Sequence, residues 1–212
     1  MRILIVSNRL PVTVIEKGGK LRFQQSTGGL VSGLSTYLDS LSAIGGSAYG
    51  VKWQASTNLS QIKSAPTNYM WVGWPGGVVE DVSKEELTKS LLKLNAYPVL
   101  LSEKTMDKFY YGFCNKIIWP LFHYFPSYVV YDEDYWNHYK IVNETFCNAI
   151  TEIINKDDIV WIQDYHLMLL PKLLRDKFPD MQIGFFLHIP FPIQKLSGPL
   201  PYMVRTSLHR NL

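Results

Sequence analysis

The sequence predicts an α/β fold with a mainly parallel, doubly wound sheet. Three runs of aliphatic and β-branched residues, at 3–7, 159–162 and 183–187, have the length and composition of strands buried on both faces. A segment with helical spacing separates the last two runs, which is typical of a βα unit. With 212 residues, of which 47% are apolar, the chain is long enough to bury such a core. Right-handed crossovers would then bring the carboxyl ends of the strands to one edge, where ligands of such sheets bind.

The first elements follow from this pattern. The strand at 3–7 leaves the sheet at Asn8-Arg9-Leu10-Pro11, which reads as a loop. Short β-prone segments at 12–15 and 21–23 flank Lys17-Gly18-Gly19-Lys20, so we expect a hairpin that pairs outside the main sheet.

The middle of the chain also alternates between patterns typical of helices, loops and strands. Leucines recur at helical spacing over 30–41, whereas 58–68 is polar and predicts a loop. A strand is expected at 69–72, ending at Gly73-Trp74-Pro75-Gly76-Gly77. Ser83-Lys84-Glu85-Glu86 forms a capping box for a helix reaching Leu92, and a strand is expected at 98–101.

The second half predicts longer helices. Residues 105–124 are mostly aromatic and irregular in period, and their first half is expected to be helical. Residues 132–154 have the apolar spacing of a long amphipathic helix. A helix over 167–178, interrupted in its first turns by Pro171, precedes the strand at 183–187.

Composition excludes several classes of protein. A net charge of +3 without a basic run disfavours nucleic-acid binding and a polybasic membrane anchor. No apolar run has the length of a signal peptide or membrane span, and Cys114 and Cys147 read as isolated core thiols, so we expect a cytoplasmic protein. Asp164 and His166 are too few ligands for a metal site, and the Gly-x-Ser-x-Gly hydrolase motif is absent.

Four predicted strand ends carry residues that packing does not require. They are Asn8-Arg9, Trp74 with Gly76-Gly77, Asp164-Tyr165-His166, and His188-Ile189-Pro190. Any one of them has an ordinary structural explanation, such as a surface charge, a helix N-cap or a loop residue. Together they favour a binding site. Gly28-Gly29 before a helix could hold an anion, although the motif alone favours a plain helix entry for this pair.

Five motifs, in order and spacing, resemble the trehalose-6-phosphate synthase family, and they cover nearly the whole chain. They are Ser7-Asn8-Arg9, Gly28-Gly29-Leu30, Trp119-Pro120-Leu121-Phe122-His123-Tyr124, Trp161-Ile162-Gln163-Asp164-Tyr165-His166-Leu167, and Phe185-Phe186-Leu187-His188-Ile189-Pro190-Phe191-Pro192. The resemblance implies the Rossmann-like N-terminal domain of a GT-B glycosyltransferase. It also implies transfer of glucose from UDP-glucose or a related donor to glucose 6-phosphate, with retention of configuration and without a metal or other cofactor.

The resemblance assigns roles to individual residues. Arg9 would hold the acceptor phosphate, and the acceptor sugar would contact Trp74, Tyr110, Trp119 and Asp164. Gly28 and Gly29 would touch the donor diphosphate, and His188 the donor glucose. His188 and Asp164 are therefore the expected catalytic residues.

The match weakens towards the C-terminus. Residues 1–192 are expected to form one acceptor-side domain, whereas 193–212 diverge, with Lys195 in place of an acidic residue and a Gly198-Pro199 break. The family's second, donor-binding domain has no counterpart, so the chain is expected to be inactive without a separate C-terminal partner. Two alternatives stay open: a non-catalytic sugar-phosphate-binding or regulatory module, and a sibling synthase with another phosphorylated acceptor such as glycerol 3-phosphate.

Overall fold

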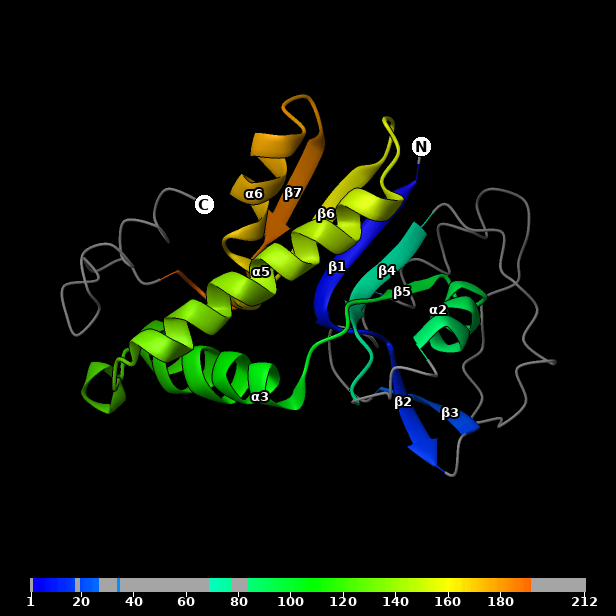
Figure 1. The fold of residues 1–212 in the computed structure, drawn as a ribbon. Coiled ribbons are helices and arrows are strands. Elements are labelled where there is room, and N and C mark those ends of the chain that lie inside the picture. Colours follow the sequence, from blue (N-terminus) through cyan, green and yellow to red (C-terminus); the bar gives the residue numbers. More distant parts are fainter. Residues whose placement is uncertain (1, 18–19, 27–33, 35–68, 78–83, 192–212) are drawn as a thin grey trace. The chain divides into compact units, whose positions relative to one another are not determined.

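The computed structural model describes residues 2–17, 20–26, 34, 69–77 and 84–191 (Figure 1). The chain divides into two compact units. The first contains Met1–Ile5 and Arg9–Leu100, and the second contains Val6–Asn8 and Leu101–Leu212. Each unit is described by itself below.

The main sheet has five strands in the order β5-β4-β1-β6-β7. β4 pairs with β5 in parallel, and β6 pairs with β7 in parallel. This arrangement confirms the mainly parallel α/β class predicted from the sequence. The strands are β1 Ile3–Arg9, β4 Tyr69–Trp74, β5 Ala96–Pro98, β6 Ile159–Gln163 and β7 Gln182–Phe186.

In the first unit, β2 (Val12–Lys17) and β3 (Lys20–Gln25) form the predicted antiparallel hairpin, which is a separate two-stranded sheet. Helix α2 (Lys84–Leu92) also forms as predicted and buries Leu87 and Leu91. The strand expected at 98–101 was wrong in position, because β5 pairs with β4 from Ala96 onward and ends at Pro98, which has no N–H to donate.

In the second unit, one helical stretch runs through α3 (Glu103–Met106), the π-helix η3 (Asp107–Ile118) and α4 (Trp119–Phe122). The helix expected in the first half of 105–124 is therefore confirmed, and it continues to Phe122. A π-helix closes i→i+5 hydrogen bonds, such as the one from Trp119 N to Cys114 O at the end of η3, and is too rare to be expected from a sequence pattern.

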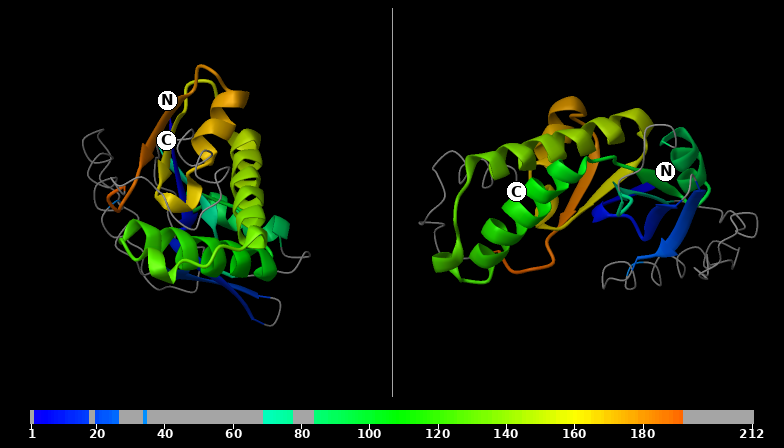
Figure 2. Two further views of the ribbon diagram at one scale, coloured as in Figure 1. Left: turned by 90° about the vertical axis from the view of Figure 1, so that its left-hand side faces the viewer. Right: turned by 60° about the horizontal axis from the view of Figure 1, so that its bottom comes forward.

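Helix α5 (Glu133–Ile153) runs alongside this stretch and has the predicted boundaries, with Asp132 as its N-cap (Figure 2). Phe109 and Phe113 of η3 pack on Tyr139 of α5, with ring centroids 5.9 and 4.6 Å apart. Cys114 and Cys147 are buried, as predicted. This aromatic layer holds η3 on α5 and so positions Tyr110 of η3.

After β6 come the 3-10 turn η5 (Tyr165–Leu167) and helix α6 (Leu170–Lys177). The expectation that Pro171 interrupts a helix was wrong. Pro171 lies in the first turn of α6, where the N–H that proline lacks has no partner in the helix. A second 3-10 turn, η4 (Pro126–Tyr128), precedes α5.

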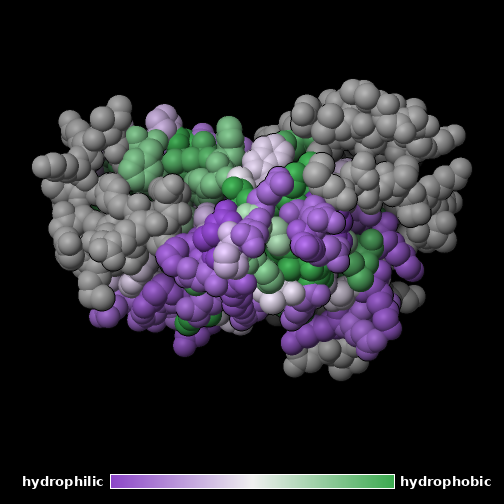
Figure 3. Space-filling view, turned by 90° about the horizontal axis from the view of Figure 1, so that it is seen from above, coloured by the Kyte–Doolittle hydropathy of each residue, from purple (hydrophilic) through white to green (hydrophobic). Residues whose placement is uncertain are grey.

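Several predictions fall outside the described residues: the helix at 30–41, the loop at 58–68, the cap at Ser83 and the segment 193–212. Across the part that is described, no helix has the length and apolar character to cross a membrane. Figure 3 shows hydrophobic residues reaching the surface among hydrophilic ones.

Candidate functional site

At the end of β1, Arg9 lies over an aromatic ring. Its guanidinium carbon is 5.2 Å from the ring centroid of Trp74, the last residue of β4. This cation–π contact orients the arginine, which stays exposed. The buried Nε1 of Trp74 has no hydrogen-bond partner among the described residues.

The turn after β4 is shaped around Arg9. Gly76 has a φ of +86°, and a Cβ at this position would lie 2.8 Å from Nη2 of Arg9 and 3.0 Å from Cγ2 of Thr13. Two backbone hydrogen bonds hold the turn, from Leu10 N to Trp74 O and from Val14 N to Pro75 O. Glycine therefore suits the backbone conformation at position 76, and a Cβ there would force the flexible end of Arg9 to move. We call Arg9, Trp74 and Gly76 the Arg9 cluster.

In the second unit, Asp164 directly follows β6 and has a φ of +70°. A positive φ is uncommon for a residue other than glycine, and such strain concentrates at functional sites. Its backbone N–H donates to Phe186 O at 2.7 Å, and its Oδ1 accepts from the N–H of Tyr165 at 2.9 Å. The carboxylate is thereby held at the end of the strand, 21% exposed.

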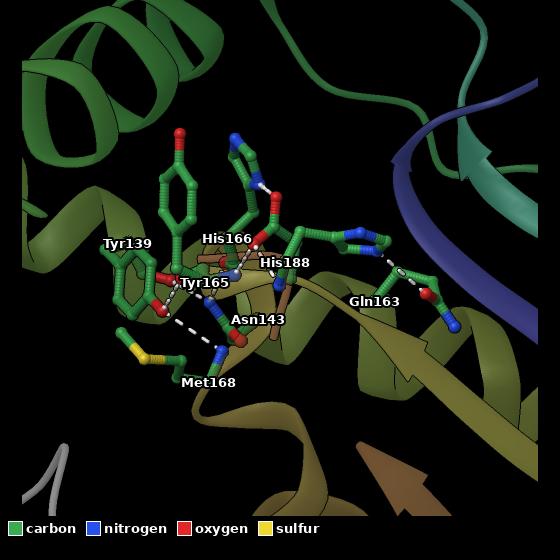
Figure 4. A network of polar contacts seen from close by, with 8 residues as sticks. Tyr139, Asn143, Gln163, Tyr165, His166, Met168 and His188 are labelled. Carbon is green, nitrogen blue, oxygen red and sulfur yellow. Dashed lines mark hydrogen bonds and ion pairs between the residues drawn. The ribbon is translucent and has the colours of Figure 1, made fainter. Parts of the chain in front are cut away.

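His188 follows the neighbouring strand β7 and meets Asp164. Its backbone N–H donates to Asp164 Oδ1 at 3.4 Å, and its Nε2 lies 3.1 Å from Oε1 of Gln163, a distance that suits an Nε2–H donor (Figure 4). The two predicted catalytic residues are therefore brought together, and Gln163 orients the His188 ring.

Beside them, the His166 imidazole is largely buried. The ring of Tyr165 stacks on it at 4.2 Å and that of Tyr110 at 5.6 Å, and its Nδ1 is 3.8 Å from Asp164 Oδ2. Burial lowers the pKa of His166 to about 4. The Asp164 carboxylate opposes this shift in the pKa, and His188 adds to it. The ring is therefore neutral at pH 7. We call Tyr110, Gln163, Asp164, His166 and His188 the Asp164 cluster.

Helix α5 anchors the turn that carries this cluster. The buried Tyr139 hydroxyl donates to Tyr165 O at 2.7 Å and accepts from Met168 N at 3.1 Å. The side-chain amide of Asn143 donates to His166 O at 3.3 Å (Figure 4). Burial raises the pKa of Tyr139, so this hydroxyl keeps its proton and its donor role. These bonds satisfy the backbone of a short turn that has little secondary structure of its own.

The remaining predicted residues have different surroundings. Trp119 begins α4, is 44% exposed, and stacks on His123 with ring centroids 4.1 Å apart. Gly28 and Gly29 lie outside the described residues.

Sequence reasoning missed Gln163 as a site residue, and it included His166 in a candidate strand end without assigning it a role, although both stand in the motif that contains Asp164. Their neighbours reveal their roles, since Gln163 contacts His188 and His166 contacts Tyr110. A polar residue at the last position of a buried strand was the available signal for Gln163.

The chemistry of the two clusters differs. Arginine is permanently charged and forks onto two phosphate oxygens. A carboxylate accepts hydrogen bonds from sugar hydroxyls, and an imidazole next to it can donate one. Within the described ranges, no group of three or more His, Cys, Asp or Glu side chains is arranged to hold a metal ion.

Known proteins resemble this chain along its whole length. It is 41% identical over 202 residues to the alpha,alpha-trehalose-phosphate synthase [UDP-forming] A of Dictyostelium discoideum, which covers 94% of this chain and 24% of that protein. It is 39% identical over 207 residues to the 56 kDa subunit of the alpha,alpha-trehalose-phosphate synthase [UDP-forming] of Saccharomyces cerevisiae, covering 94% of this chain and 37% of the relative.

Two solved structures share the fold. The E. coli protein bound with UDP-2-fluoro glucose has a TM-score of 0.64 and 28% identity. The match covers 100% of this chain and 38% of the E. coli chain. The alpha,alpha-trehalose-phosphate synthase (UDP-forming) from Burkholderia xenovorans in complex with glucose-6-phosphate has a TM-score of 0.60 and 26% identity. The match covers 91% of this chain and 34% of that chain. These structures confirm the predicted class, the Rossmann-like N-terminal domain of a GT-B glycosyltransferase.

The chain spans between a quarter and two fifths of the length of these relatives. The model of glycosyltransferase family 20 matches residues 1–212. Because this match covers every residue, the chain belongs to glycosyltransferase family 20.

Proposed function

We propose that this chain is the acceptor-side, N-terminal part of a retaining glycosyltransferase that makes trehalose 6-phosphate. Glucose would pass from UDP-glucose or a related nucleotide sugar to glucose 6-phosphate. The observation that carries the proposal is the Asp164 cluster, in which a strained aspartate lies beside His188 at the ends of neighbouring parallel strands. Ligands of parallel α/β sheets bind at such strand ends.

In this proposal, the acceptor sugar contacts Asp164, Tyr110 and Trp119. The free lone pairs of the carboxylate accept hydrogen bonds from sugar hydroxyls, and the exposed Trp119 ring offers an apolar face to the C–H groups of the hexose. The phosphate of the acceptor pairs with Arg9, whose guanidinium is exposed above Trp74, which forms a wall beside it.

His188 acts on the donor side. With Nε2–H donated to Gln163, the exposed imidazole presents its Nδ1 as an acceptor for a hydroxyl of the donor glucose near the reacting carbon. Gly28 and Gly29 approach the donor diphosphate. The reaction depends on positioning and on stabilising the departing diphosphate, so it needs neither a nucleophilic side chain nor a metal ion. The other part of the donor site belongs to the second domain of the GT-B fold.

The proposal is tested by calorimetry and by a UDP-release assay. Titration of the chain with glucose 6-phosphate should give saturable binding, and Arg9→Ala should weaken it by about 1.5–3 kcal/mol, the loss of a charge-assisted hydrogen bond. UDP release from UDP-glucose should require both glucose 6-phosphate and an added donor-binding domain of the family, and should persist in EDTA.

Other outcomes separate the alternatives. Binding of glucose 6-phosphate without UDP release in any mixture would favour a non-catalytic sugar-phosphate module. Release with glycerol 3-phosphate but not with glucose 6-phosphate would favour a sibling synthase. His188→Ala should reduce turnover far more than affinity for glucose 6-phosphate, and the reverse pattern would remove His188 from the donor side.

A further inference from the structure

We propose that His166 is a positioning residue of the acceptor site, which holds the Tyr110 ring and the Asp164 carboxylate in one fixed geometry. The inference rests on the proposed function, because Tyr110 and Asp164 are the residues assigned there to the acceptor sugar. His166 contacts both of these residues and is more deeply buried than Asp164.

His166 contacts both residues, which come from different elements. Tyr110 belongs to η3, and its ring is nearly parallel to the imidazole, with an interplanar angle of 11° and a centroid distance of 5.6 Å. Tyr165 stacks on the same imidazole at 4.2 Å and 23°. Two stacked rings leave the imidazole little freedom to rotate, so its ring nitrogens keep fixed directions.

One oxygen of Asp164 is held by the backbone, and the other faces His166. Oδ1 accepts from the N–H groups of Tyr165 and His188. Oδ2 lies 3.8 Å from Nδ1 of His166, close enough for attraction but longer than a hydrogen bond. A small closure of the site on a bound sugar would bring this pair to hydrogen-bond distance.

The surroundings of the imidazole also determine where its proton lies. Nε2 is buried and has no hydrogen-bond partner within the described part of the chain. A proton on Nε2 would leave a buried donor unpaired and would direct the Nδ1 lone pair at a carboxylate. A proton on Nδ1 leaves Nε2 as a buried acceptor instead of a buried donor, and it directs a donor rather than a lone pair at the Asp164 carboxylate. His166 is therefore a neutral Nδ1–H imidazole that supports Asp164 from behind.

The first test needs neither ligand nor substitution. In the full chain labelled with 15N-histidine, the nitrogen shifts of His166 at pH 7 should report a neutral ring protonated at Nδ1. A ring protonated at Nε2, or a charged ring, would overturn the inference.

The second test separates the two contacts with matched variants. His166→Phe keeps a ring beside Tyr110 but removes the donor, whereas His166→Asn places an amide N–H near the position of Nδ1 but removes the ring. We expect His166→Phe to weaken glucose 6-phosphate binding about tenfold, with about half of that loss recovered in His166→Asn. UDP-glucose KM, measured with the added donor-binding domain, should stay unchanged.

Wild-type affinity for glucose 6-phosphate in His166→Phe would overturn the positioning role and leave the proposed function intact. If the wild-type chain itself failed to bind glucose 6-phosphate, the proposed function would fail, and the tautomer measurement would still decide whether His166 supports Asp164. Urea unfolding of both variants identifies any loss of affinity that comes from unfolding.

Discussion

The Arg9 cluster and the Asp164 cluster hold opposite charges at strand ends by different means. Arg9 is exposed. Its guanidinium lies over the ring of Trp74, in space that Gly76 leaves free because it has no side chain. Asp164 is mostly covered and is held by hydrogen bonds to Oδ1 and by the buried turn around His166. In the Arg9 cluster, a permanently charged guanidinium is exposed to solvent. In the Asp164 cluster, neutral groups such as the His166 imidazole surround a carboxylate.

This difference predicts which property each cluster loses on substitution, ligand affinity or stability. Substitutions in the Arg9 cluster should change ligand affinity more than stability, because an exposed guanidinium contributes little to the fold. Substitutions around Asp164 should lower the free energy of unfolding first, because they leave buried polar groups without partners. The following experiments test that contrast, from the largest expected effect to the smallest.

The largest effect is a pH dependence of stability that arises from His166. Its pKa is about 4 in the folded chain, below the ordinary value of about 6.5 expected in the unfolded chain. The unfolded chain therefore takes up the proton first, and stability that is complete above pH 6.5 is lost as the pH falls towards 4. The loss is on the order of 3 kcal/mol. Urea unfolding at pH 7 and pH 4.5 measures it.

His166→Asn should remove most of that pH dependence, whereas His123→Asn, at the Trp119 stack, should keep it. The same pH dependence in wild type and His166→Asn would show that other groups cause it.

Tyr139→Phe should lower the free energy of unfolding by about 2 kcal/mol. It removes the hydroxyl that bonds Tyr165 O and Met168 N, and so leaves buried backbone groups unpaired. Urea unfolding at pH 7 measures the change, with Tyr128→Phe as the control because that side chain is 73% exposed. Equal stability of the two variants would contradict the anchoring role of Tyr139.

Gly76→Ala should cost about 1–2 kcal/mol of stability, because alanine is strained at a φ of +86°. Its Cβ should also displace the Arg9 guanidinium and weaken glucose 6-phosphate binding. Gly184→Ala is the matched control, since a Cβ there meets Trp161 at an ordinary 3.6 Å. Calorimetry and thermal unfolding of both variants separate the two effects, and unchanged affinity in Gly76→Ala would contradict the shaping of Arg9 by this glycine.

The smallest effect is expected for Trp74→Leu, which removes the π face below Arg9. The cation–π contact of an exposed arginine contributes about 0.5–1 kcal/mol, so glucose 6-phosphate binding should weaken by roughly two- to fivefold. Trp74→Phe should keep most of the affinity because it retains a ring. A loss in Trp74→Phe as large as that in Trp74→Leu would indicate that the indole N–H, not the π face, matters.

Much of the fold was predictable because local patterns decide it. The period-2 and helical spacings of 12–15, 21–23 and 132–154 correctly predicted the hairpin and α5. The errors occurred where local rules compete with packing. The length of the helical stretch around η3 depends on the packing of Phe109 and Phe113 on α5, and the start of β5 depends on its register with β4.

For the candidate site, the sequence predicted Arg9, Asp164 and His188 from their positions at strand ends, and the roles of Tyr110 and Trp119 from a family resemblance. It did not reveal Gln163 or the role of His166, because these depend on contacts with residues 25 and 56 positions away. No local spacing encodes such distances.

The sequence by itself determined the α/β class, most of the strands and helices of the described chain, and the membership of glycosyltransferase family 20. These depend on hydrophobic periodicity and on motifs that can be read along the chain. Only the tertiary structure decided that Gly76 makes room for Arg9 and that His166 is a neutral ring stacked on Tyr110 beside Asp164. These contacts and the burial of His166 arise between segments that are distant in the sequence and that folding brings together. Local sequence patterns therefore cannot predict them.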